Sequence, residues 1–372
     1  MTLSSPLPKL EALIKIKDVI KTYKTPAGSV DVLKHINLEF LPGEFTAIVG
    51  RSGSGKSTLI NMITGIDHPT HGSVYALGSN LHAMKEGELA VWRGQNMGIV
   101  FQFFQLLPML SVIENVLLAM DLAEIIPADQ REERARQLLE MLDLQDEADK
   151  LPGALSGGQQ QTAAIARALA NDPPIIAADE PTGNLDTGTA ETIFAIFRSL
   201  VKQGKTIIMV THDQQLAESA DRQVVLSDGE LLDPLLVNLF PHLPHPALLQ
   251  VTHLLSDEIV LPPHAAHVFN NPMPGLIVVK SGSVQLITDE GQAGVENQYI
   301  LNAGQALAPD DRLSGPSVKA GTNGAVIQSI EQAHWHEWHA SHQPGFEKSE
   351  ANLQKTAIGK LFSVNSFTER RF

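Results

Sequence analysis

The stretch FTAIVGRSGSGKST, residues 45 to 58, joins a short apolar run to a glycine-rich loop. Residues 45 to 50 form a short apolar run that ends in a turn signal, which predicts a buried parallel strand. The glycine-rich segment GRSGSGKST follows at 50 to 58, and LINMITGI at 59 to 66 has the apolar spacing of a helix. A strand, a glycine loop and a helix in this order are the context of a phosphate-binding loop, and they predict an α/β fold of the P-loop NTPase type.

The residue types in this loop suit the phosphates of a nucleotide. Glycines let the backbone curl so that several N–H groups point at the β-phosphate. Lys56 would place its charge on the β- and γ-phosphates, and the hydroxyl of Ser57 would ligate Mg²⁺. A glycine-rich turn that holds a lysine by chance is the alternative, and the flanking strand and helix disfavour it. The predicted ATP-binding residues are Gly50, Ser52, Gly53, Gly55, Lys56, Ser57 and Thr58.

Two further apolar strands end in polar side chains. PIIAADE at 174 to 180 ends in Asp179, which would hold Mg²⁺, and Glu180, which would polarise a water for attack on the γ-phosphorus. TIIMVTHD at 206 to 213 carries His212 at its end, which would contact the γ-phosphate. Ligands of open α/β sheets bind just beyond the carboxyl ends of the strands, so we expect these side chains near the glycine loop.

A second phosphate-binding turn is predicted in LSGGQQQTA, residues 155 to 163. A serine and two glycines open a helix there, and helix amino termini attract anions through free N–H groups and the helix dipole. These residues include no lysine or arginine to hold a phosphate. The residues alone do not show which molecule carries the phosphate that this turn would bind.

Composition sets broad limits. The chain has 372 residues, 43% of them hydrophobic, with a formal net charge of -15, a pI of about 5.3 and no cysteine. This length suits two or three domains, and the acidic balance argues against a nucleic-acid partner. Disulfides and thiolate metal sites are excluded. We expect no secretory signal, and no uncharged apolar run reaches the ~20 residues of a membrane helix. If the protein works at a membrane, we expect another chain to cross it.

Together, the motifs resemble the ATP-binding subunit of ABC transporters over about residues 13 to 232. The resemblance identifies the glycine loop as Walker A and the strand end at Asp179 and Glu180 as Walker B. It places Gln102 of GIVFQ in the Q-loop and Asp186 of PTGNLD in the D-loop. The roles that it implies are catalysis by Glu180, His212 and Gln102, Mg²⁺ binding by Ser57, Gln102 and Asp179, and adenine stacking by Tyr23.

The resemblance also implies which phosphate the turn at 155 to 163 binds. In this family the signature LSGGQ binds the γ-phosphate of an ATP held by a second copy of the chain, so that two chains close head to tail around two ATPs. The signature residues would be Ser156, Gly157, Gly158 and Gln159, carried by a helical arm at about 88 to 166. One departure is Thr162, where the family usually has arginine. Arg167 lies about 140° around the helix and is not an obvious substitute.

A narrower resemblance concerns residues 88 to 116 and the stretches NMITGID and ADEPTGNLD. They look like the branch that serves lipoprotein release, macrolide export and cell-division permeases. This implies an energy-coupling ATPase on the inner face of the cell membrane, with a separate permease of few helices as its partner. FQFFQLLPML, at 101 to 110, would receive a helix of that permease or would be an internal packing segment. Alternatives are a nucleotide-responsive regulatory ATPase and a soluble ABC ATPase acting on DNA or ribosomes. The chain has one set of nucleotide-binding motifs and no heptad run, which disfavours the soluble ABC ATPase.

The sequence pattern changes from residue 233 onward. Residues 233 to 246 are proline-rich and predict a linker, and residues 247 to 345 show short β patterns separated by glycine turns. These patterns predict a smaller all-β jelly-roll domain, followed by a polar tail at 346 to 372. FNNPMPGLIVVKSGSVQLI and YILNAGQAL resemble the β-roll of cyclic-nucleotide-binding domains, but the phosphate cassette of that family has no counterpart here. We therefore expect a regulatory or dimerising β-roll.

The segment HWHEWH, at 334 to 339, leaves two interpretations open. On a strand, His334 and His336 would share a face; on a helix, His336 and His339 would. The cluster would hold a metal ion, or it would be structural, with Trp335 and Trp338 as core anchors at helical spacing.

Overall fold

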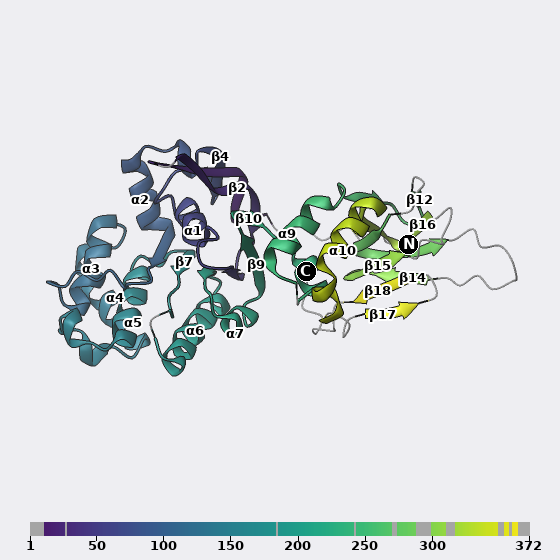
Figure 1. Ribbon diagram of the computed structural model, residues 1–372. Helices are drawn as coiled ribbons and strands as arrows, with labels where there is room; N and C mark the ends of the chain where they lie inside the picture. The colour runs from purple at the N-terminus through teal and green to yellow at the C-terminus, as the bar shows by residue number, and fades with distance from the viewer. Residues whose placement is uncertain are drawn as a thin grey trace, which may run out of the picture. The chain divides into compact units, whose positions relative to one another are not determined.

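The computed structural model describes residues 11–26, 28–183, 185–241, 243–269, 274–287, 299–309, 317–348, 353–356 and 359–363. The chain divides into two units, Met1–Leu231 and Leu232–Phe372 (Figure 1). The elements of the first unit are β1 (Ile14–Thr25), β2 (Gly28–Phe40), β3 (Phe45–Val49), α1 (Lys56–Thr64), β4 (His71–Ala76), β5 (Ser79–Asn80), α2 (Glu86–Asn96), β6 (Met97–Val100), α3 (Val112–Ala123), α4 (Ala128–Met141), α5 (Gly157–Ala168), β7 (Ile175–Asp179), α6 (Thr187–Lys202), β8 (Thr206–Val210), α7 (Gln214–Glu218), β9 (Arg222–Ser227) and β10 (Glu230–Leu231), with 3₁₀ turns at Leu81–Ala83, Gln145–Glu147 and Pro152–Ala154.

Six strands of the first unit form a sheet in the order β10-β9-β3-β8-β7-β6, in which all neighbours are parallel except β10 and β9. Alternate residues of its strands enter two different cores: Ile207 of β8 belongs to one, and Ile208 to the other. A strand buried on both faces needs a continuous apolar run, which explains the sequence of these strands. The register pairs Val210 with Ile48 and with Asp179, so β3, β7 and β8 end at one edge.

Different elements cover the two faces of this sheet. On one face, α1 packs with the antiparallel sheet β2-β1-β4-β5, and both contribute to one core. On the other face, residues of α3, α4, α5 and α6 form the second core. The strand ends that carry the predicted chemistry therefore lie between two packed layers, which hold them in place.

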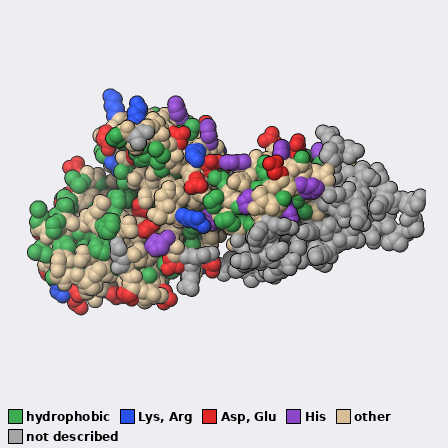
Figure 2. Space-filling view, viewed as in Figure 1, with side chains coloured by type: hydrophobic (Ala, Val, Ile, Leu, Met, Phe, Trp, Pro, Cys, Tyr) green, Lys and Arg blue, Asp and Glu red, His purple; other side chains and the backbone are tan. Residues whose placement is uncertain are grey.

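The region predicted as a helical arm contains helices α2 to α5, and α3, α4 and α5 contact one another. Figure 2 shows hydrophobic side chains gathered over the end of the unit that carries α3 and α4. Met109 and Leu122 are 78% and 77% exposed, although both are large and apolar. An exposed apolar surface of this kind is typical of a docking site for another protein.

The second unit is built on an eight-stranded antiparallel sheet with the path β11-β16-β13-β15-β18-β17, to which β12 and β14 are joined through β16 and β13. It has its own core, which includes Ile277, Val279 and Ile327. The elements are α8 (Pro234–Leu239), α9 (His245–Leu254), β11 (Ile259–Leu261), β12 (Ala266–Val268), β13 (Leu276–Ile287), β14 (Tyr299–Asn302), β15 (Gln305–Pro309), β16 (Ser317–Ile330), α10 (Gln332–Lys348), β17 (Leu353–Thr356) and β18 (Gly359–Ser363).

The structure corrects the prediction for this part of the chain in two respects. The predicted linker at 233 to 246 contains α8 and the start of α9, and the predicted all-β domain at 247 to 345 contains the rest of α9 and most of α10. Asp233 caps α8 by accepting from the N–H of Leu235 at 2.8 Å, and Pro234 occupies the first turn, where its missing N–H costs nothing. The predicted tail contributes β17 and β18, and β18 pairs with β15; the tail residues 349–352, 357–358 and 364–372 lie outside the described part.

The HWHEWH segment lies on α10, where Trp335 and Trp338 are buried and their rings stack at 5.4 Å. Within the part of the chain that the structure describes, no group of three or more His, Cys, Asp or Glu could hold a metal ion. None of the described helices is both long enough and apolar enough to cross a membrane.

Candidate active site

The glycine loop lies at the carboxyl edge of the six-stranded sheet, between β3 and α1. A Cβ atom on Gly50 would lie 2.2 Å from the carbonyl oxygen of Leu226, so only glycine fits at this point. The ammonium of Lys56, a residue only 6% exposed, donates to the carbonyl oxygens of Gly50 and Arg51 at 3.0 Å each. These oxygens carry no net charge, so a phosphate can replace them as the partner of the lysine.

The other predicted residues of the loop surround this lysine. Gly53 and Gly55 have φ angles of 79° and 102°, which let the backbone turn tightly. Ser52 is exposed, and Thr58 lies in the first turn of α1. Because α1 begins directly after Gly55, its free N–H groups and the positive end of its dipole are at the loop. The loop therefore has the backbone and the charge of an anion site.

Ser57 and Asp179 form an oxygen pair beside the loop. The Ser57 hydroxyl donates to Oδ1 of Asp179 at 3.2 Å. Burial raises the pKa of Asp179 and the charge of Glu180 adds to the rise, while the Ser57 hydrogen bond and Lys56 act in the opposite direction. A partly buried carboxylate that is short of positive charge, with a hydroxyl next to it, fits Mg²⁺. Gln102, the third predicted ligand, has its amide nitrogen on Glu180 instead.

Glu180 is the point at which three of the predicted catalytic residues meet. Its Oε2 accepts from the amide nitrogen of Gln102 at 3.1 Å and lies 3.3 Å from Nδ1 of His212. Its backbone has a φ of 46°, and its N–H donates to the carbonyl of Val210 at the end of β8. A glutamate held in the left-handed region is strained, and such strain concentrates at functional sites. The carboxylate is thus placed by its backbone and by two side chains.

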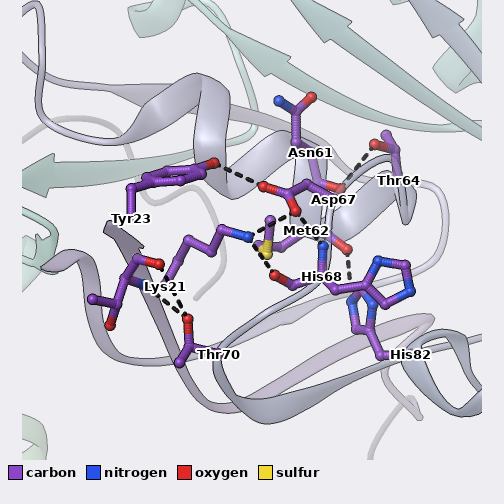
Figure 3. A network of polar contacts seen from close by, with 10 residues as sticks. Lys21, Tyr23, Asn61, Met62, Thr64, Asp67, His68, Thr70 and His82 are labelled. Atoms are coloured by element: carbon purple, nitrogen blue, oxygen red, sulfur yellow. Dashed lines mark hydrogen bonds and ion pairs between the residues drawn. The ribbon is translucent and has the colours of Figure 1, made fainter. Parts of the chain in front are cut away.

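Tyr23 belongs to a polar network between β1 and the segment after α1 (Figure 3). Its hydroxyl donates to Oδ2 of Asp67 at 2.8 Å, and the buried ammonium of Lys21 donates to Oδ1 at 2.7 Å and to the carbonyl of His68. Burial alone would raise the pKa of Asp67, but the hydrogen bonds from Lys21 and Tyr23 outweigh it, and the pKa is lowered. Lys21 also lies over the Tyr23 ring, 4.8 Å from its centroid. Asp67 thus holds the hydroxyl end of the Tyr23 ring and Lys21 covers one of its faces, while the residue remains 38% exposed.

The signature turn lies at the amino end of α5. Ser156 and Gln159 form a capping box, in which each side chain accepts from the backbone N–H of the other, at 3.2 and 2.9 Å. Gln159 also donates to Glu147 at 2.9 Å. These contacts leave Ser156 and Gly157 exposed, so the helix terminus faces outward.

The D-loop lies beside this turn. Asp186 caps α6 by accepting from the N–H and the hydroxyl of Thr189 at 3.1 and 2.6 Å, and these bonds lower its pKa. A Cβ on Gly158 would lie 2.6 Å from Cγ2 of Thr189, so α5 and α6 meet there in close contact.

The structure thus gathers most of the predicted site at one sheet edge. The phosphate loop, Asp179, Glu180, Gln102 and His212 share contacts there. The signature turn instead donates to Glu147 and lies beside Phe104, Leu185 and Thr189, and none of its described contacts is with the phosphate loop. The anchoring of Tyr23 by Lys21 and Asp67 joins residues that are far apart in the chain, and no local pattern of the sequence indicates it. The capping box did have a signal, the S-x-x-Q spacing of 156 to 159.

Known proteins with similar sequences share this site region. Residues 33–183 match the ABC transporter family. The chain is 47% identical to the ABC transporter ATP-binding protein YvrO of Bacillus subtilis over 220 residues, which is 59% of this chain and 96% of that one. It is 44% identical to the macrolide export ATP-binding/permease protein MacB of Syntrophobacter fumaroxidans over 58% of this chain and 31% of MacB.

A solved structure gives the same result for the fold. The dimeric, post-hydrolysis structure of the ATP-binding cassette MJ0796 bound to ADP and Pi, a protein of Methanocaldococcus jannaschii, matches with a TM-score of 0.56 and 43% identity over 59% of this chain and 96% of that one. With its phosphate loop, paired acids and sheet order, the chain belongs to the ABC transporter family of ATP-binding proteins and is an ATPase of the ABC type.

Proposed function

We propose that this chain is the energy-coupling subunit of an ABC transporter, in which two copies close around two ATP molecules and drive a separate membrane permease. One observation carries the proposal: the phosphate loop and the Glu180 cluster share one sheet edge, while the signature turn presents an outward-facing helix terminus elsewhere in the chain. A chain built in this way holds the two halves of an ATP site apart, and a second copy can join them.

The side chains at the sheet edge divide the work of hydrolysis. Lys56 exchanges its two carbonyl partners for the β- and γ-phosphates. Ser57 and Asp179 would hold Mg²⁺, and the bound ion would supply positive charge to the phosphate oxygens. Glu180 accepts a proton from the attacking water, Gln102 and His212 orient this carboxylate, and His212 contacts the γ-phosphate. The exposed ring of Tyr23 stacks on adenine.

Three residues of the partner's exposed turn, Ser156, Gly157 and Gly158, complete each site. They offer N–H groups and the positive end of the α5 dipole to the γ-phosphate. The absence of a lysine from the turn is then expected, because the opposite chain supplies Lys56. Asp186 lies next to the turn through Thr189 and Gly158, so we place the D-loop at the same interface.

The apolar surface on the helical arm is the proposed permease contact. Phe103, Leu107 and Met109 are exposed on the loop between β6 and α3. This loop is held in shape by Asn115, which is 1% exposed, donates to the carbonyls of Leu107 and Leu110, and accepts from the N–H of Leu107. A fixed apolar loop loses little entropy when it docks on another protein. The partner would be a permease of few helices, which places this chain on the inner face of the cell membrane.

The second unit is the proposed regulatory or dimerising module, a β-roll similar to that of cyclic-nucleotide-binding domains. Its antiparallel sheet and separate core support an independent module. The same observation supports a second candidate function, in which this unit is the output of a nucleotide-responsive regulatory ATPase. Recovery of a membrane permease with the full-length chain supports transport, whereas a soluble partner bound through residues 232–372 supports regulation.

The composite site is tested by mixing two inactive variants. Lys56→Ala removes the phosphate-loop cation, and Ser156→Arg blocks the signature turn, so each variant alone should hydrolyse ATP very slowly. In a mixed dimer one site has both defects and the other has none. Half of randomly paired dimers are mixed, so turnover should return to at most about a quarter of the wild-type value. Equal mixing with no recovery, while both variants still dimerise with ATP, contradicts the head-to-tail arrangement.

A further inference from the structure

A half-buried arginine connects the signature helix to the loop that follows Gln102. Arg167 lies in the last turn of α5, and its guanidinium donates to two consecutive carbonyls, through Nη2 to Phe104 at 2.9 Å and through Nη1 to Gln105. Both carbonyls belong to the chain just after the Q-loop residue. A planar guanidinium suits this task, because it can present two N–H groups in a fixed fork.

The two residues that Arg167 holds adopt an unfavourable backbone conformation. Phe104 and Gln105 have φ angles of 51° and 50°, in the left-handed region that residues with side chains seldom occupy. Two successive residues of this kind need support from their surroundings. Arg167 is half-buried, its bond to Phe104 is partly shielded from water, and burial lowers its pKa. The arginine therefore stabilises a turn that would otherwise relax.

This turn leads directly to the catalytic cluster. Gln102 stands two residues before Phe104 and donates to Glu180, so the direction in which the chain leaves Gln102 affects where its amide points. At the other end, α5 is an unbroken helix whose amino terminus is the signature turn. We propose that Arg167 is a positioning residue, which fixes the amide of Gln102 on Glu180 and ties that contact to the signature helix. This inference rests on the proposed role of Gln102 in ATP hydrolysis.

A double-mutant cycle tests the proposal in the full-length chain. Arg167→Lys keeps the charge but cannot hold two carbonyls in a fixed fork, and it should lower kcat for ATP about tenfold with KM changed less than about twofold. In a Gln102→Ala background the same substitution should change kcat less than about twofold, because its effect passes through Gln102. Arg131→Lys is the matched control, since Arg131 also binds a carbonyl, that of Ile126, within the helical arm. It should leave kcat unchanged.

A rescue variant separates positioning from folding. Gln105 is exposed, and Gln105→Gly would remove the cost of its left-handed backbone. Added to Arg167→Lys, it should restore kcat by about threefold or more, and it also provides a stable background if Arg167→Lys alone folds poorly. An equal loss of kcat in both Gln102 backgrounds, or a Gln102→Ala chain with normal kcat, overturns the proposal. Failure of the proposed function is seen separately, as normal turnover in Glu180→Gln.

Discussion

At the scale of single residues, Glu180 combines a strained backbone with two side-chain donors. The left-handed φ aims its carboxylate at Gln102 and His212 and away from Asp179, which faces Ser57. The two adjacent acids are therefore placed for the different roles that we propose, Mg²⁺ binding by Asp179 and proton transfer by Glu180. This division explains why each acid should respond differently to substitution.

Replacing Glu180 by glutamine should keep ATP binding and slow turnover. The amide has the shape of the carboxylate but cannot accept the proton, and removal of a general base typically costs about 10²–10⁴ in rate. Steady-state hydrolysis and ATP binding by titration measure the two effects, and an ATP-bound dimer should accumulate. Glu191→Gln, at an exposed position of α6, is the control. Near-normal turnover in Glu180→Gln would show that another group activates the water.

His82, next to the Tyr23 network, should make the first unit sensitive to acid. Burial lowers its pKa to about 4, with a smaller contribution from His68. The unfolded chain takes up this proton near pH 6.5 and the folded chain only near 4. Between these values the unfolded state binds more protons, so the free energy of unfolding falls as the pH falls.

Substitution of His82 checks the origin of that effect. His82→Gln keeps a donor for the carbonyl of Met62, which Nε2 of His82 contacts at 3.2 Å, but does not titrate. Its urea midpoint should fall less between pH 7 and pH 5 than that of the natural protein. His71→Gln, at an exposed position of β4, serves for comparison. Equal falls in all three proteins would assign the acid sensitivity to other groups.

At the scale of elements, the apolar patterns of the sequence predict the buried strands. The sequence does not indicate the elements that depend on helix capping or on strand pairing. The strand ends at Gly50, Asp179 and His212 were readable because strands buried on both faces need continuous apolar runs. Helix α8 was missed because Pro234 reads as a breaker, although proline also starts helices. Strands β17 and β18 were missed because the tail is polar and edge pairing leaves little trace in composition. The Arg167 contacts depend on tertiary approach, which spacing alone cannot show.

The packing of α5 against α6 gives a prediction at this scale. Gly158→Ala would press a methyl group onto Cγ2 of Thr189 and disturb the cap at Asp186, at a cost of about 1–3 kcal/mol in the free energy of unfolding. ATP turnover should fall as well, because the signature and D-loop meet there. Thr189→Ser removes that methyl and keeps the hydroxyl, so the double variant should recover both properties. Gly153→Ala, which meets nothing within 4 Å, is the control. A double variant no better than Gly158→Ala would show that the close contact is unimportant.

At the scale of the whole molecule, the chain joins two units with separate cores. All residues of the proposed ATP site precede Leu232, and the six-stranded sheet ends with β10 in the first unit. The second unit contributes no strand to that sheet within the described residues. Nucleotide binding and the function of the second unit should therefore be separable.

A chain that ends at Asp233 should fold and bind ATP with an affinity close to that of the full-length protein. The reason is that the sheet, both of its cores and the phosphate loop stay complete. Titration with ATP and a thermal unfolding curve measure the outcome, and Lys56→Ala in the short chain provides the background signal. A well-folded short chain that no longer binds ATP would show that the second unit takes part in the nucleotide site.

The hydrogen bonds of Lys56 within the phosphate loop have a consequence for the rate at which nucleotide binds. Because Lys56 holds the carbonyls of Gly50 and Arg51, hydrogen bonds within the loop itself keep the cradle curved around its cation. Arrival then requires only an exchange of partners at one nitrogen, with no search through loop conformations. Association with nucleotide should proceed as a single phase, and the observed rate constant should rise linearly with nucleotide concentration. The second-order rate constant should be close to that of an association without conformational change. The same readiness makes the cradle indiscriminate toward small anions, so inorganic phosphate in a buffer should compete with ATP for it.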